Sequence, residues 1–198
     1  MSEVTQAHVE HDTLTLDVNI PEHDKRETSA LFRRTRELLI EREGGRCFLS
    51  NATAEESGHP LEAHHHPIER CMAELIDWVR FADDCKKGQW GPYAMAFDWD
   101  DFFRGAMVHT HDGVVEREAD DPLHVSNSVQ FVRPRDPYLF VDDMTVNGML
   151  LSKKFHTGKG SGIHDMPFPL YIAQRYAREG YQFSSVTTIH HFDGEGHQ

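Results

Sequence analysis

The sequence contains few cysteines, and this scarcity excludes the folds that depend on them. Its 198 residues include three cysteines, Cys47, Cys71 and Cys85, and no two of them form a Cys-x-x-Cys pair. So low and odd a number argues against a disulfide framework and against a zinc site built from four cysteines. We therefore expect three buried or idle thiols.

Long apolar runs are also missing. No stretch of the sequence approaches the roughly 20 apolar residues that a membrane-spanning helix requires. Residues 1–20 have neither the basic region nor the apolar region of a signal peptide. We expect a protein that makes no membrane contact and remains in the cytoplasm, which would be the host cytoplasm if a phage encodes it.

Basic residues are outnumbered by acidic ones. The chain has 20 Lys and Arg against 33 Asp and Glu, which gives a formal net charge of −13 with neutral histidines. Neutralisation of phosphates by Lys and Arg supplies much of the affinity of nucleic-acid-binding proteins, so this balance argues against strong non-specific binding. Basic residues cluster at 25–42 and 153–159, and a bound divalent cation would add positive charge locally.

The apolar content, 38%, is enough for the core of one α+β domain. We expect an N-terminal arm at 1–27 and a single domain at 28–198, in which residues 88–140 are rich in loops and aromatic side chains. The expected helices cover 28–43, 68–86, 145–156 and 169–179, and the expected strands cover 46–49, 61–66, 129–132, 138–141 and 181–191. The strands at 46–49 and 61–66 are expected to pair with each other as a β-hairpin.

Histidine is the residue in excess, with 15 copies, several of them in doublets or triplets. Neighbouring side chains on a strand point to opposite faces, so adjacent His64 and His65 can divide two tasks. His64 can bind a metal ion, while His65 can face the substrate and take a proton from water. A helix packed across the hairpin can bring His156 to the metal and place Asn147 where it orients the His65 ring.

Two segments together resemble the HNH endonuclease family. The first is the Leu-Glu-x-His-His unit at 61–65, and the second places a histidine, His156, nine positions after Asn147. The resemblance implies a ββα-metal (His-Me finger) core formed by residues 44–67 and 145–166 and embedded in additional helices. It implies the same roles: His65 as general base, Asn147 as its orienting residue, and His64 and His156 as ligands of Mg²⁺, Mn²⁺, Ni²⁺ or Zn²⁺.

A third ligand is expected from His164. Many members of the family carry a further histidine shortly after the last helical one. Here the interval from His156 to His164 is longer and contains the glycine-rich turn at 158–162. That turn can lead the chain back to the metal and deliver His164.

The sequence departs from the family in two further ways. His65 and Asn147 are much farther apart than in ordinary members, so residues 68–140 must be an insertion. Many members bind a structural zinc through two Cys-x-x-Cys pairs, whereas the equivalent positions here read Cys47-Phe-Leu-Ser50 and Ser152-Lys-Lys-Phe155. We expect ordinary packing by the insertion and flanking helices to replace that zinc.

Two functions remain open at this point. The resemblance implies a metal-dependent endonuclease that hydrolyses phosphodiester bonds, with DNA as the expected nucleic acid. The acidity, the insertion and the missing zinc cysteines suggest instead a weakly active or inactive metal-binding module in a larger phage or mobile-element complex, with a protein partner bound through 68–140. Two weaker candidates for a metal site are the acidic cluster at 98–101 and the pair His109 and His111. Acidic turns are usually just solvated, and no third partner is evident for the two histidines.

Overall fold

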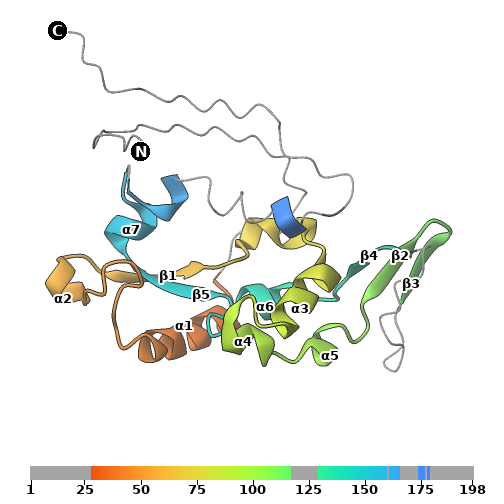
Figure 1. Cartoon of the computed structure of the whole chain (residues 1–198), viewed down its shortest axis with the longest axis horizontal. Coiled ribbons are helices and arrows are strands. Elements are labelled where there is room, and N and C mark those ends of the chain that lie inside the picture. The colour runs from red at the N-terminus through yellow and green to blue at the C-terminus, as the bar shows by residue number, and fades with distance from the viewer. Residues whose placement is uncertain (1–27, 117–128, 160, 166–173, 177, 179–198) are drawn as a thin grey trace, which may run out of the picture.

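The computed structural model describes residues 28–116, 129–159, 161–165, 174–176 and 178, and these residues form an α+β fold, as expected. The fold contains two small antiparallel sheets, one lying between helices and one projecting from an end of the molecule (Figure 1). One sheet has two strands in the order β1-β5, and the other has three strands in the order β3-β2-β4. None of the described helices is long and apolar enough to cross a membrane.

The two-stranded sheet joins segments that are distant in the sequence. Strand β1 (Leu61–His65) runs antiparallel to β5 (Gly148–Ser152), so that His64 lies opposite Met149 and His65 lies opposite Gly148. Helix α7 (Lys153–Thr157) begins directly after β5, and a short 3₁₀ helix, η2 (Ile163–Asp165), follows it. Figure 1 shows α7 on one side of the strand pair and helix α1 (Ala30–Arg42) on the other.

The expected hairpin within 46–66 is wrong, because the partner of β1 is β5. Residues 46 and 47 have no regular secondary structure, and residues 48–50 form a turn rather than a strand. Gly44, Gly45 and Asn51 adopt positive φ angles of 60°, 64° and 54°, which turn the chain on both sides of this segment. Only a single backbone hydrogen bond, from the Phe48 amide to the Leu150 carbonyl at 2.8 Å, connects the segment to β5 among the described residues.

The helix expected at 145–156 is also wrong, because this segment is strand β5 followed by α7. Leu150 packs against Leu39 on the side of α1, while Leu151 packs against Cys47 and Ile163 on the other side. A strand buried on both faces is a continuous apolar run, and such a run cannot be distinguished from a buried helix by its periodicity. Asn147 therefore precedes a strand instead of opening a helix.

Helix α1 confirms the expectation for 28–43. The hydroxyl of Ser29 caps its first turn by accepting the Phe32 amide at 3.0 Å. Thr35, in the middle of the helix, accepts the Met144 amide at 2.9 Å and donates to the carbonyl of Asp142 at 3.2 Å. These bonds attach the helix to the chain just before β5.

The described residues of 68–140 form most of the larger core of the molecule, and helices cover much of the segment where loops were expected. The helices of this region are η1 (Arg70–Leu75), α3 (Trp78–Lys86), α4 (Gly91–Met95), α5 (Trp99–Phe102) and α6 (Tyr138–Val141). The single helix expected at 68–86 is divided because Ile76 is extended and Asp77 caps α3. The strand expected at 138–141 is helix α6, whose first amide is accepted by the side chain of Asp136 at 2.9 Å.

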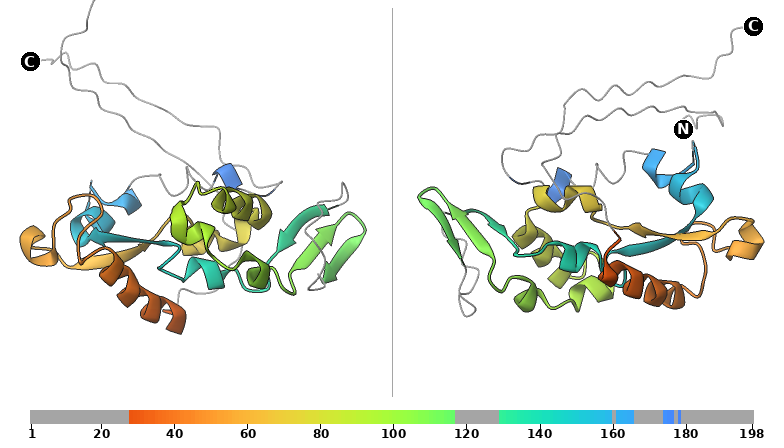
Figure 2. Two further views of the ribbon diagram at one scale, coloured as in Figure 1. Left: turned by 60° about the horizontal axis from the view of Figure 1, so that its bottom comes forward. Right: turned by 180° about the vertical axis from the view of Figure 1, so that it is seen from behind.

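The remaining elements lie at the two ends of the molecule (Figure 2). Helix α2 (Ala54–Ser57), with a capping box from Thr53 and Glu56, precedes β1. Strands β2 (Met107–Thr110), β3 (Gly113–Glu116) and β4 (Val129–Arg133) form a ribbon that projects away from β1 and β5, which confirms the strand expected at 129–132.

Several sequence expectations fall outside the described residues. They are the arm at 1–27, the strand at 181–191 and most of the helix at 169–179, of which the 3₁₀ helix η3 (Gln174–Tyr176) is described.

The aromatic core around Phe81 gives a test of the fold. Phe81 has no exposed surface, and the rings of Trp78, Trp99, Phe140 and Tyr176 lie 4.9–6.1 Å from its centroid. We predict that Phe81→Ala lowers the free energy of unfolding by about 3–5 kcal/mol, because it removes buried area and leaves a cavity. Met95→Ala, at a half-exposed position of α4, should change it by less than about 1 kcal/mol. Urea denaturation of both variants measures the difference, and equal losses would contradict this account of the core.

Candidate metal centre

Strand β1 presents its two adjacent histidines to opposite faces of the sheet. His64 lies on the side of α7, where its ring centroid is 5.3 Å from that of His156 and 5.0 Å from that of His164. His65 lies on the side of α1, where its ring is 5.4 Å from that of Phe32. This division agrees with the alternation expected for a strand.

The three histidines predicted as ligands come together. His64 is on β1, His156 is on α7 and His164 is on η2, and one ligand atom from each lies within 4.8 Å of the others. The Nε2 atoms of His156 and His164 are 3.0 Å apart. Rings that direct nitrogen atoms toward one point from three separate elements are suited to a single metal ion.

The glycine-rich turn delivers His164 to this cluster. The Gly162 amide donates to the Gly158 carbonyl at 2.6 Å, which turns the chain back toward α7. A Cβ atom on Gly162 would lie 2.8 Å from the backbone oxygens of Gly158 and His156, so no larger residue fits there without a shift of the backbone. The turn thus has a structural role that allows the close approach of η2 to His156.

Two carboxylates contact the Nδ1 atoms of the three histidines. Glu62 Oε2 lies 2.7 Å from His156 Nδ1. Glu69 Oε1 lies 3.5 Å from His64 Nδ1 and 3.8 Å from His164 Nδ1. A carboxylate hydrogen-bonded at Nδ1, as Glu62 is to His156, fixes the ring and its tautomer, so that Nε2 remains with a lone pair for a metal.

The roles of both carboxylates were not predicted from the sequence. Glu62 was recognisable, because it lies two residues before His64 and therefore on the same face of β1. Glu69 follows the histidine triplet after a turn at Pro67, and nothing in the local sequence indicated that it returns to the cluster.

His64 is neutral in this environment. It is 1% exposed, and neither ring nitrogen has a hydrogen-bond partner among the described residues. Burial, followed by the neighbouring His164 and His156, lowers the pKa of His64 to about 2. A buried, neutral imidazole without a hydrogen-bond partner is costly unless its lone pair is used, and coordination of a metal would use it.

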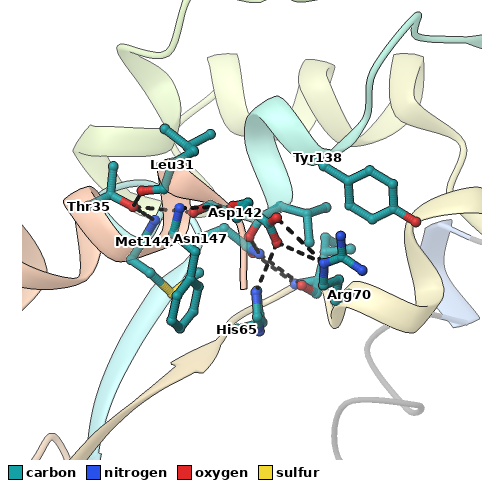
Figure 3. A network of polar contacts seen from close by, with 12 residues as sticks. Leu31, Thr35, His65, Arg70, Tyr138, Asp142, Met144 and Asn147 are labelled. Carbon is teal, nitrogen blue, oxygen red and sulfur yellow. Dashed lines mark hydrogen bonds and ion pairs between the residues drawn. The ribbon is translucent and has the colours of Figure 1, made fainter. Parts of the chain in front are cut away.

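His65 belongs to a separate polar network (Figure 3). Its Nε2 atom lies 3.4 Å from Asp142 Oδ1, and the same oxygen accepts a hydrogen bond from Arg70 Nε at 3.2 Å. Both His65 and Asp142 are buried, at 5% and 2% exposed. Although burial alone would raise the pKa of Asp142, hydrogen bonds from His65 and Ser29 and the charge of Arg70 hold it below its usual value. Asp142 is therefore ionised and holds the His65 ring.

Asn147 holds the backbone near His65 instead of its ring. Its side-chain oxygen accepts the Ile68 amide at 3.0 Å, and its amide nitrogen donates to the carbonyls of Ile68 and Val141 at 2.8 Å each. Its own carbonyl accepts the His66 amide at 3.0 Å. Asn147 thus joins the segment after β1 to the segment before β5, while the ring contact that we expected from Asn147 is made by Asp142.

The weaker sequence candidates do not form metal clusters among the described residues. His109 stacks on Phe131 with ring centroids 4.0 Å apart, and His111 contacts Gln130. Asp98 caps helix α5 by accepting the Asp101 amide at 2.9 Å. The three cysteines are all free.

Comparison of the chain with protein-family models, with curated proteins and with solved structures found no match. The chemistry of the site is therefore argued from its own residues.

The histidine cluster predicts one bound metal ion per chain. We expect a saturating excess of Zn²⁺ or Ni²⁺, about 100 times the dissociation constant, to raise the free energy of unfolding by about 2.7 kcal/mol. His156→Ala should abolish this increase, because it removes one of three ligands. His59→Ala, at an exposed histidine outside the cluster, should leave it unchanged. Calorimetric titration and thermal melting measure both effects, and equal metal responses in the two variants would refute the cluster as the binding site.

The carboxylate behind His156 gives a second prediction. Glu62→Gln keeps the size of the side chain but removes the charge that contacts Nδ1 at 2.7 Å. We expect metal affinity to fall by roughly 10- to 100-fold, as for other carboxylates that support metal-bound histidines. Glu55→Gln, at an exposed position of α2, is the matched control. Unchanged affinity in Glu62→Gln would mean that the contact does not support the ligand.

Proposed function

We propose that the protein is a divalent-metal-dependent endonuclease of the HNH type, which hydrolyses phosphodiester bonds in nucleic acid, with DNA as the expected substrate. The observation that carries the proposal is the pairing of two groups on one strand. Three histidines converge on the α7 side of β1, and the adjacent His65 is held by a buried carboxylate on the other side. Hydrolysis of a phosphodiester needs both a cation and a general base.

The strand, strand and helix that carry these residues support the same proposal. In our proposal, β1, β5 and α7 are the two strands and the helix of a ββα-metal core within residues 44–67 and 145–166. The segment 68–140 is then an insertion with its own aromatic core. The Asn147 contacts to Ile68 and Val141 join the two ends of this insertion, so the insertion does not separate β1 from β5.

The ligand set supports a catalytic rather than a structural metal site. Three protein ligands leave coordination positions for water or substrate, whereas structural zinc sites are closed by four. A bound divalent cation supplies charge stabilisation at the scissile phosphate and at the departing oxygen. Glu62 contacts Nδ1 of His156 at 2.7 Å, and Glu69 lies near the Nδ1 atoms of His64 and His164.

His65 acts as the general base in this proposal. The contact between Nε2 and Asp142 leaves Nδ1 to take a proton from water. The water oxygen forms a bond to phosphorus, and the bond from phosphorus to the leaving oxygen breaks. The leaving oxygen takes a proton from solvent, and the His65 imidazolium then releases its own proton to solvent. The ionised Asp142 stabilises the imidazolium that His65 becomes, and Arg70 keeps Asp142 in place.

The burial of His65 and the net charge of the chain favour a second function. His65 is 5% exposed and lies against Phe32 of α1, and the net charge of the chain is −13. Both features suit a metal-stabilised module that works inside a larger complex, with a protein partner on the segment 68–140. Under this alternative, metal raises the melting temperature without turnover, and His65→Ala changes little.

Cleavage by a His65 variant separates the two functions. We predict that the protein cuts nucleic acid with Mg²⁺, Mn²⁺, Ni²⁺ or Zn²⁺, and that His65→Ala slows cleavage by roughly 10²- to 10⁴-fold, the usual contribution of a general base. Metal affinity should stay unchanged, because His65 is on the face opposite the cluster. His59→Ala is the control. Equal cleavage rates for both variants, or no cleavage of single- or double-stranded DNA or RNA with any of the four metals, would contradict the nuclease proposal.

A further inference from the structure

A pocket lies beside the ends of β1 and β5. It has a volume of about 370 Å³ and is lined by the C-terminal end of α1, the start of α4 and the residues that follow His65. This volume is within the range of small-molecule sites. Gly148, one of its lining residues, is the strand partner of His65, and His66, another, directly follows His65. The pocket is thus within one residue of the proposed general base along the strand.

Aromatic rings form much of the pocket lining. The indole of Trp90 is fixed by a hydrogen bond from Nε1 to the Tyr176 hydroxyl at 2.7 Å. The ring of His66 stands nearly perpendicular to it, at 78° and 6.1 Å between centroids. Both rings line the pocket and give it the aromatic surface on which a flat ligand can pack.

Polar groups complete the lining. The guanidinium of Arg42 donates to the carbonyls of Thr145 at 2.6 Å and Gly148 at 3.0 Å, and lies 4.8 Å from the ring of Tyr93. Tyr93 is 51% exposed, so its ring is accessible from solvent. The carboxylate of Glu43 also lines the pocket and accepts a hydrogen bond from Arg42 Nε at 2.8 Å. Its second oxygen can accept a hydrogen bond from a ring N–H or an exocyclic amine of a base. Aromatic faces with a cation and a hydrogen-bond acceptor suit a flat heteroaromatic ring.

We propose that this pocket binds one unpaired nucleobase of a single-stranded nucleic acid, next to the bond that is cleaved. The inference rests on the proposed nuclease function and names the form of its substrate. Stacking on aromatic side chains recognises bases whose faces are free, and the bases within a duplex are already stacked on each other. A paired base would have to leave the duplex before it entered the pocket.

The fluorescence of Trp90 reports on the pocket directly. The sequence has three tryptophans, and Trp78 and Trp99 are only 2% and 3% exposed, so a base that stacks in the pocket changes the emission of Trp90. The experiment titrates the full chain with a single-stranded 12-residue oligothymidylate in the presence of EDTA. Without metal no cleavage occurs, so binding in the pocket is measured separately from catalysis. We expect saturable quenching.

Tyr93→Ala tests the pocket with little risk to the fold. Loss of one stacking partner should weaken oligonucleotide binding by roughly 5- to 150-fold, the usual effect for one base stacked on an aromatic side chain. Met95→Ala, at an equally exposed position of the same helix, should bind as the unmodified chain does. Equal affinities in the two variants would overturn the proposal.

Three further probes identify what the pocket recognises. An abasic oligonucleotide of the same length has the same phosphates but no bases, and it should not quench Trp90. A duplex should bind more weakly than the single strand, and thymidine monophosphate should bind more weakly than the oligonucleotide. Quenching by the abasic strand, equal binding of the duplex, or equal binding of the mononucleotide would each overturn the proposal. The oligonucleotide could quench Trp90 and yet remain uncut after metal is added. That result would refute the nuclease function but would support base binding in the pocket.

Discussion

The antiparallel pairing of β1 with β5 is the interaction on which the rest of the site depends. It places Gly148 opposite His65 and Met149 opposite His64, and α7 begins at the end of β5. Without this pairing His156 and His164 would have no fixed relation to His64. Asn147 supports the pairing at the ends of the strands, because its side chain makes three buried hydrogen bonds to the backbone of Ile68 and Val141.

The histidine cluster and the polar network of His65 lie on opposite faces of this small sheet. On one face, burial lowers the pKa of His64 to about 2, and carboxylates contact the Nδ1 atoms of the histidine cluster. On the other face, Asp142 and Arg70 hold His65. Glu62 and Glu69 also explain part of the acidity of the chain, since a site with two carboxylates and a divalent cation has no net charge.

The site residues were predicted from the sequence more accurately than the fold around them was. The alternation of side chains on a strand was sufficient to separate His64 from His65, and the three predicted ligands do meet. The strand pairing could not be predicted, because the partner of β1 lies beyond the whole of segment 68–140 and no local pattern encodes so distant a contact. Leu150 and Leu151 are buried on opposite faces, which made β5 resemble a helix. The role of Asp142 was missed because only the fold brings it to His65.

The most direct test of this account is a crystal structure with Zn²⁺ or Ni²⁺ bound, with the metal located by its anomalous scattering. The account predicts a single ion held by His64, His156 and His164 through their Nε2 atoms, at about 2.0–2.1 Å for zinc, with at least one position left to water and with His65 outside the coordination sphere. A metal bound through His65, or one that lacks any of the three predicted histidines, would contradict it.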